Sequence, residues 1–260
     1  MNSKYWLEAK DVTAIKNGYE VIKDLSLKLK NGERTIILGP NGSGKSSIVD
    51  LINRNIYPLI KTNSQFKLFD KEQIDIWELR QKISTVNNEI KSRINPNLKI
   101  YDLIVSGLHG KYCKVKNINF NDKNLTKAII QRMSLNSIAD KCFGYLSDGE
   151  KQIALIARAL INKPEILILD EPITNLDLKS KYFLIDKIHE LSYLNLNIIC
   201  ITHDISVISK AFTRIILIKD RKIIKDGKPI EIMNSTNINS LFDTNIKLIE
   251  NNEGWDILRY

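Results

Sequence analysis

The chain has 260 residues, of which 43% are hydrophobic and 27% are charged, and its formal net charge at pH 7 is +9. This length suffices for one large domain or two small ones, and the mixture of charged and apolar residues excludes a wholly disordered chain. No stretch approaches the roughly 18–20 uninterrupted apolar residues of a membrane-spanning helix.

The start of the chain and its cysteines both predict a cytosolic protein. Residues 1–10 lack the apolar core and the cleavage site of an export signal. The cysteines are far apart and show no metal-ligand spacing, as expected of packing or surface thiols; they are Cys113, Cys142 and Cys200. The positive charge is spread along the whole chain, so we expect no specific nucleic-acid partner.

The first part of the chain has the pattern of β-strands. Residues 21–29 alternate between apolar and polar, and the leucines on one face are Leu25, Leu27 and Leu29. An Asn-Gly pair at residues 31–32 supplies a tight turn before the apolar run 35–38. We therefore expect a β-rich segment over residues 5–38.

Helical patterns follow the β-rich segment. A helix is expected from Lys45 through Ile52. Between residues 89 and 160 strand signals largely vanish, and stretches such as 125–133 and 150–160 suit helices. We interpret residues 89–160, approximately, as a helical subdomain inserted in the core.

Two short apolar runs mark the second half of the chain, at residues 166–169 and 198–201. Because both of their faces are apolar, they suit buried parallel strands, and the helical segment 178–191 between them suits a crossover helix. A strand pair is expected over residues 214–225. Residues 228–260 are interpreted as a short C-terminal tail, mostly helical.

A glycine-rich segment, Gly-Pro-Asn-Gly-Ser-Gly-Lys-Ser, lies between the expected strand 35–38 and the following helix. This order is the setting of a phosphate-binding loop, in which successive N–H groups and the positive helix end face an anion. Lys45 is placed to reach the β and γ phosphates, and the Ser46 hydroxyl is a candidate Mg²⁺ ligand. The nucleotide-binding candidates are Gly39, Pro40, Asn41, Gly42, Ser43, Gly44, Lys45, Ser46 and Ser47.

Two adjacent carboxylates end the apolar run 166–169. Ligands of α/β sheets bind beyond the carboxyl ends of the strands, so Asp170 is a candidate Mg²⁺ ligand. Glu171 points to another side and is placed to accept a proton from the water that attacks the γ phosphate.

A third motif decides among families of nucleotide hydrolases. Residues 146–150, Leu-Ser-Asp-Gly-Glu, precede a helix and resemble the signature motif of ATP-binding cassette (ABC) ATPases, usually Leu-Ser-Gly-Gly-Gln. Residues 174–177 resemble the D-loop of that family, and residues 202–204 resemble its switch-histidine segment. The five motifs follow the family's order, so the resemblance covers essentially the whole chain.

The resemblance implies a single ABC ATPase domain over residues 1–260, of the α/β class. Its P-loop NTPase core would hold a mostly parallel sheet with helices on both faces, together with an antiparallel β subdomain and the helical insertion. The cofactors implied are ATP and Mg²⁺. In this family two chains sandwich two ATP molecules head to tail, so the first partner implied is a second copy of the cassette.

The same resemblance assigns further site residues. The helix start at Ser147 and Gly149 contacts the γ phosphate held by the opposite subunit, and Asp177 belongs to the D-loop. His203 joins Lys45 and Glu171 as a catalytic residue that contacts the γ phosphate within its own subunit. Asn88 stands at the position of the Q-loop glutamine and is the third candidate Mg²⁺ ligand, beside Ser46 and Asp170.

The chain departs from the family pattern at several positions. Asp148 replaces a glycine of the signature motif, and we expect it to point to solvent and to favour the helix N-terminus. Asn88 has one methylene less reach than glutamine. The aromatic residue that stacks on adenine is replaced by Lys16, so either Tyr19 substitutes for it or adenine is held weakly.

An ATPase of this family does work through a partner. The preferred interpretation is a peripheral subunit on the cytoplasmic face of a membrane transporter, bound to integral membrane subunits, with a solute-binding protein as a further partner in an importer. Residues 100–107 and 227–233, together with Leu241-Phe242, look most like importers of metal chelates, cobalamin or oxyanions. The alternative is a soluble ABC ATPase of iron–sulfur cluster assembly or another non-transport machine.

Overall fold

The computed structural model describes residues 4–59, 61–194, 196–252 and 254–259. The chain divides into two compact units, and each is described by itself. The first unit comprises Met1–Arg80 and Asn197–Tyr260, and the second comprises Gln81–Leu196. None of the helices in the described ranges has both the length and the apolar character that crossing a bilayer requires.

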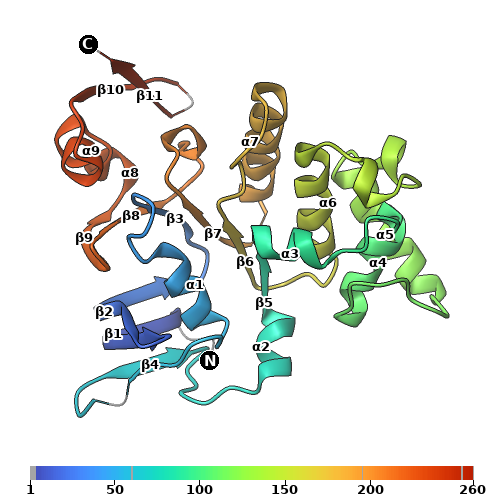
Figure 1. The fold of residues 1–260 in the computed structure, drawn as a ribbon, viewed down its shortest axis with the longest axis horizontal. Helices are drawn as coiled ribbons and strands as arrows, with labels where there is room; N and C mark the ends of the chain where they lie inside the picture. Colours follow the sequence, from blue (N-terminus) through green and yellow to red (C-terminus); the bar gives the residue numbers. More distant parts are fainter. Residues whose placement is uncertain (1–3, 60, 195, 253, 260) are drawn as a thin grey trace. The chain divides into compact units, whose positions relative to one another are not determined.

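An antiparallel sheet opens the first unit, in the strand order β2-β1-β4 (Figure 1). The expected alternation of the second strand is confirmed, because Leu25, Leu27 and Leu29 are all buried and the residues between them are exposed. The fourth strand was not expected, since it is short and half of its residues are polar. The three strands are β1 (Tyr5–Lys16), β2 (Tyr19–Lys30) and β4 (Gln65–Leu68).

A second sheet of the first unit is mostly parallel. Its strand β3 lies between β7 and β8 and pairs with both in parallel, and β9 pairs with β8 antiparallel. The three parallel strands are nearly all Ile, Leu, Thr and Cys at their buried positions, because parallel strands are covered on both faces. The strands are β3 (Arg34–Leu38), β7 (Asn197–Thr202), β8 (Arg214–Lys219) and β9 (Lys222–Gly227), and the helix after β3 is α1 (Lys45–Ile52).

The end of the chain is only partly helical, so the expectation of a helical tail is wrong for its last part. Two short helices are followed by an antiparallel strand pair in which Trp255 is buried. Residues 246–250 are Ile-Lys-Leu-Ile-Glu, in which only the first three positions alternate, so the strand signal in the sequence is weak. The elements are η4 (Ile205–Val207), α8 (Pro229–Ile232), α9 (Ser235–Phe242), β10 (Ile246–Glu250) and β11 (Trp255–Arg259).

In the second unit, a parallel pair of strands accompanies a set of helices. Val86 at the end of β5 lies opposite Leu169 of β6. The segment from residue 88 to residue 160 contains helices and turns, with α4 packed on both α5 and α6. The strands are β5 (Ile83–Val86) and β6 (Ile166–Asp170). The helices are α2 (Ile76–Lys82), which reaches the unit from the first one, α3 (Asn88–Arg93), α4 (Ile100–Ser106), η1 (Gly107–His109), α5 (Phe120–Arg132), η2 (Asn136–Ile138), η3 (Phe143–Tyr145), α6 (Asp148–Leu160) and α7 (Leu178–Ser192).

The expected fold class is therefore confirmed. Parallel strand pairs occur in both units, and the antiparallel sheet forms a separate part of the first. The buried strands β6 and β7 and the helix α7 lie within one residue of the positions that periodicity predicts.

Candidate active site

The glycine-rich loop joins the carboxyl end of β3 to the first turn of α1. Gly42 and Gly44 have φ values of 79° and 98°, a left-handed conformation that glycine adopts without strain. Because the N-cap residue of α1 is Gly44, no capping side chain covers the first N–H groups of the helix. These N–H groups and the positive end of the helix are suited to bind an anion.

The loop is held tightly against the neighbouring strand β8. A Cβ atom on Gly39 would lie 2.2 Å from the Ile218 carbonyl oxygen, so only glycine fits there. Among the described residues, nothing forms a hydrogen bond with the buried Ser43 hydroxyl. A buried polar group without a partner normally signals a ligand or water, and a phosphate oxygen would satisfy this hydroxyl.

Lys45 is the first residue of α1, and its side chain turns back onto the loop. The residue is 5% exposed, and its Nζ donates to the carbonyl oxygens of Gly39 and Pro40 at 2.8 and 2.9 Å. The loop carbonyls therefore hold the ammonium group inside the concavity in which a phosphate would bind.

His203 follows the carboxyl end of β7, next to the loop. Leu38 of β3 is level with Thr202 of β7, and the Gly39 N–H donates to the Thr202 carbonyl oxygen at 3.3 Å. The His203 side chain is exposed. The structure thus brings the switch-histidine segment and the phosphate loop together at one edge of the first unit's parallel sheet, as expected for a ligand site of an α/β protein.

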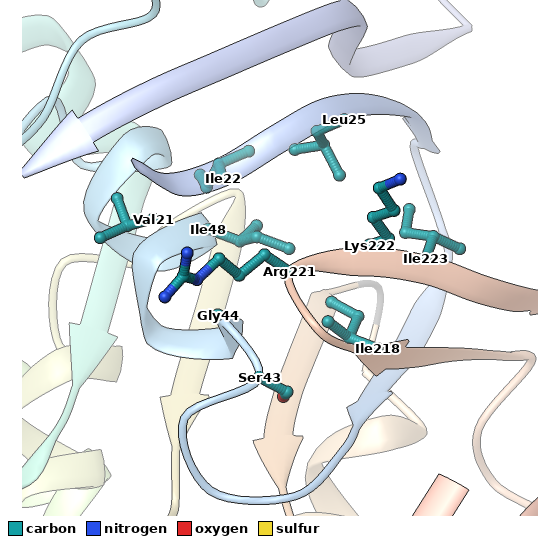
Figure 2. A pocket seen from close by; sticks show the side chains of 10 residues that line it. All are labelled: Val21, Ile22, Leu25, Ser43, Gly44, Ile48, Ile218, Arg221, Lys222 and Ile223. Atoms are coloured by element: carbon teal, nitrogen blue, oxygen red, sulfur yellow. The ribbon is translucent and has the colours of Figure 1, made fainter. Parts of the chain in front are cut away.

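A turn that the sequence did not mark as functional also contacts the loop. The backbone N–H of Arg221, in the tight turn between β8 and β9, donates to the Ser43 carbonyl oxygen at 3.0 Å. Figure 2 shows this turn beside the loop. An Asp-Arg pair between two apolar runs predicts a turn, but no sequence signal places that turn on a loop almost 180 residues earlier in the chain.

The second unit carries the carboxylates at the carboxyl end of its strand β6. Asp170 is the last residue of β6, and the pairing of Val86 with Leu169 places Asn88 just beyond the corresponding end of β5. Glu171 has a φ of 51°, an uncommon conformation for a residue with a side chain, and its Oε2 accepts a hydrogen bond from Thr174 at 3.2 Å. Strain of this kind is concentrated at functional sites.

Ser147 caps α6 through a reciprocal pair of hydrogen bonds. Its hydroxyl accepts from the Glu150 N–H at 3.2 Å, and its own N–H donates to the Glu150 carboxylate at 2.8 Å. Asp177 caps α7 and accepts from the Ser180 N–H and hydroxyl at 3.0 and 2.6 Å. These bonds from Ser180 lower the pKa of the Asp177 carboxyl, whose negative charge lies near the positive start of the helix.

The two helix starts lie against each other within the second unit. A Cβ atom on Gly149 would lie 2.5 Å from the Ser180 Cβ and 2.6 Å from its hydroxyl oxygen. The signature motif and the D-loop are therefore neighbours, and Gly149 is required by this close approach.

Replacing Gly149 by alanine is therefore expected to lower the free energy of unfolding by about 1–3 kcal/mol, because the added methyl group overlaps Ser180. Chemical denaturation measures this loss. The Gly149→Ala, Ser180→Gly double variant should recover part of it, since glycine at position 180 removes both overlapping atoms. Strictly additive losses in the two single variants and the double variant would contradict the contact.

Asp148 is exposed, as expected, and is the first residue of α6. Burial and the charge of Lys151 lower the pKa of Lys91, whereas the Asp148 carboxylate opposes them. The negative charge that distinguishes this signature motif therefore lies within electrostatic range of Lys91 of α3.

Lys16 and Tyr19, the two residues considered for the adenine site, differ in their surroundings. Lys16 forms an ion pair with Asp50 of α1, with 2.7 Å between Nζ and Oδ2. Tyr19 is 73% exposed at the start of β2. Lys16 is thus committed to a partner on α1, and Tyr19 is accessible for stacking.

The candidate residues divide between the two units, and their roles remain predictions. The first unit holds Tyr19, Gly39, Pro40, Asn41, Gly42, Ser43, Gly44, Lys45, Ser46, Ser47 and His203, and the second holds Asn88, Ser147, Gly149, Asp170, Glu171 and Asp177.

Comparison with known proteins identifies the family. Residues 22–174 match the ABC transporter family. The chain is 31% identical over 246 residues to YmeB of Lactococcus lactis, an uncharacterized ABC transporter ATP-binding protein, with 93% of this chain and 94% of that protein covered. It is 28% identical over 250 residues to YclP of Bacillus subtilis, the petrobactin import ATP-binding protein, with 93% and 94% covered.

Solved structures agree with these relatives. The fold is similar to that of cbiO1 from Clostridium perfringens, part of the ABC transporter complex cbiONQ, with a TM-score of 0.77, 25% identity and coverage of 93% and 97%. It is also similar to the ATP-binding cassette MJ0796 in a dimeric post-hydrolysis state with ADP and Pi, with a TM-score of 0.70, 27% identity and coverage of 85% and 98%. The chain belongs to the ABC transporter family and is one of its ATP-binding, ATP-hydrolysing subunits.

Proposed function

We propose that the chain is the ATPase subunit of a membrane importer whose solute is a metal chelate, cobalamin or an oxyanion. The observation that carries the proposal is the similarity to the petrobactin import protein, which extends over 93% of the chain. The similarity to cbiO1, part of a transporter complex, supports attachment to membrane subunits. The segments 100–107 and 227–233 support the same class of importer.

Binding of ATP begins with its phosphates. The N–H groups at the start of α1 and the Ser43 hydroxyl bind phosphate oxygens, and Lys45 leaves the carbonyl oxygens of Gly39 and Pro40 to pair with the β and γ phosphates. The lysine is already inside the loop, so little of its conformational freedom is lost on binding.

The side-chain oxygens of Ser46, Asp170 and Asn88 are each chemically suited to Mg²⁺, because it prefers hard oxygen ligands and usually binds through one or two protein groups, water and phosphate. When bound, it would neutralise charge on the phosphate oxygens. No group of three or more His, Cys, Asp or Glu side chains in the described ranges could hold a metal.

Hydrolysis then depends on positioned side chains. Glu171 accepts a proton from the attacking water, whose oxygen bonds to the γ phosphorus while the bond to the β-phosphate oxygen breaks. Thr174 orients the Glu171 carboxylate. His203 contacts the γ phosphate and stabilises the charge that develops on it.

A second copy of the chain completes each site. The start of α6, where Ser147 is exposed and Gly149 is buried behind it, clamps the γ phosphate that the other copy holds, and Asp177 links the two sites. The dimeric state of the related cassette MJ0796 supports this arrangement. Asn88, on the Q-loop, transmits the change to membrane subunits on the cytoplasmic face.

Purification of the tagged protein from detergent-solubilised membranes tests the assignment. We expect integral membrane subunits to co-purify, and cells without the protein to lose uptake of one solute among a metal chelate, cobalamin and molybdate. The Lys45→Ala variant should still co-purify with the membrane subunits but should not restore uptake. Recovery from the soluble fraction with an iron–sulfur scaffold, and unchanged uptake of all three solutes, would favour the non-transport alternative.

A further inference from the structure

The turn between β8 and β9 places an arginine beside the phosphate loop in a conformation that suits glycine better. Asp220 and Arg221 have φ values of 49° and 64°, and glycine or asparagine usually occupies such turn positions. The Arg221 N–H donates a hydrogen bond to the Ser43 carbonyl oxygen, which fixes the turn against the phosphate loop. A glycine at position 221 would make the same backbone hydrogen bond, so the turn itself does not explain the arginine.

The Arg221 side chain lies over the first turn of α1. A Cβ atom on Gly44 would be 3.5 Å from the Arg221 Cα and 3.2 Å from the Val21 carbonyl oxygen, so these residues are in close contact. Figure 2 shows the Arg221 side chain running over Gly44 toward Val21, away from Ser43. Lys222 extends to the other side, beside Ile223.

The guanidinium group is exposed, and within the described ranges it has no hydrogen-bond or ion-pair partner. The hollow that Arg221 and Gly44 line measures only about 10 Å³, no more than a water molecule occupies, so a ligand cannot lie beneath the side chain. A partner for the guanidinium must therefore lie on its outer face.

The surroundings define the chemistry of that partner. The guanidinium lies near the aliphatic side chains of Val21 and Ile48, and Lys45 is not among the residues that line this hollow. The positive end of α1 also disfavours a lone cation at this place. A planar guanidinium packs well on an aromatic ring, and the part of ATP that extends beyond the phosphate loop carries a purine ring.

We propose that Arg221 is a nucleotide-binding residue that packs on the adenine base, in place of the aromatic residue that Lys16 replaces. The proposal rests on ATP binding at the phosphate loop. Tyr19 and Val21 are two residues apart in β2, so their side chains lie on the same face of the strand. The base would lie beside that face, with Arg221 contacting it from the turn between β8 and β9.

Binding of Mg²⁺-ATP and Mg²⁺-tripolyphosphate to the intact protein, measured by calorimetry, separates contact with the base from contact with phosphate. The Arg221→Gly variant should bind ATP about 3- to 20-fold more weakly, with unchanged affinity for tripolyphosphate. The Arg221→Lys variant should be similarly weakened, because it keeps the charge but loses the planar group. Thermal unfolding should show that Arg221→Gly is folded, since glycine suits the turn.

Two neighbouring variants serve as controls. Asp220→Gly relieves the same backbone conformation one residue earlier, and Lys222→Gln removes one positive charge from the same hairpin; both should bind ATP like the wild type. Unchanged ATP affinity in Arg221→Gly would overturn the proposal. Equal losses for ATP and tripolyphosphate, or full rescue by Arg221→Lys, would overturn the base contact in favour of a phosphate contact. Absence of ATP binding by the wild type would instead overturn the proposed function.

Discussion

Replacing Glu171 by glutamine is expected to lower ATP turnover by roughly 10²–10⁴ while pairing of two copies in the presence of ATP is kept or strengthened. The amide has the size of the carboxylate but cannot accept a proton from water. Glu171 also holds an uncommon backbone conformation at the end of a buried strand, and its carboxylate accepts a hydrogen bond from Thr174. Steady-state hydrolysis and size-exclusion chromatography with ATP measure the two effects.

Glu165 offers a matched control, because it immediately precedes the first residue of the same strand, at the opposite end from Glu171, and pairs with Lys82 at 3.7 Å. The Glu165→Gln variant should hydrolyse ATP at the wild-type rate. Unchanged turnover in Glu171→Gln would remove that residue from the role of base. A Glu171→Gln variant that hydrolyses ATP slowly and also no longer forms a pair of copies in the presence of ATP would contradict the proposal that Glu171 acts in hydrolysis and not in dimer formation.

Loss of ATP binding is expected when Lys45 is replaced by alanine. The ammonium group lies inside the loop, and its removal takes away the main positive charge that faces the β and γ phosphates. We expect at least about a 100-fold rise in the dissociation constant, which corresponds to two charge-assisted hydrogen bonds of about 1.5 kcal/mol each. Calorimetric titration with ATP provides the measurement.

Lys10→Ala is a suitable control for the overall charge, since it removes an exposed lysine from β1 of the same unit. This variant should bind ATP normally. Circular dichroism of Lys45→Ala should show an intact fold, because the lost bonds belong to the loop alone. Near-normal ATP affinity in a folded Lys45→Ala variant would rule out the proposed phosphate cradle.

Most core elements could be predicted from the sequence because their signals are local. A fully apolar run such as 198–201 has few alternatives to a buried strand, and α1 begins and ends where the pattern places it. The contiguous loop from Gly39 to Ser46 likewise carries its own geometry, since glycines, lysine and helix start are all neighbours along the chain.

The shorter and more polar elements could not be predicted in the same way. The strand β4 is four residues long, and the terminal pair β10 and β11 leaves Leu258 about half exposed. Such strands depend on pairing with partners elsewhere in the chain rather than on their own periodicity. The helical expectation for the tail failed there because intrinsic helix propensity is a weak signal, which pairing with another strand can override.

Motif order and local glycine chemistry were thus enough to assign the family and to predict a phosphate loop and the carboxylates that follow the buried strand. The packing of Gly149 on Ser180, the pairing of Lys16 with Asp50 and the position of Arg221 above Gly44 emerged only in three dimensions. Each of these contacts joins segments that are distant along the chain, and their approach is set by strand register and helix packing, which no single segment encodes.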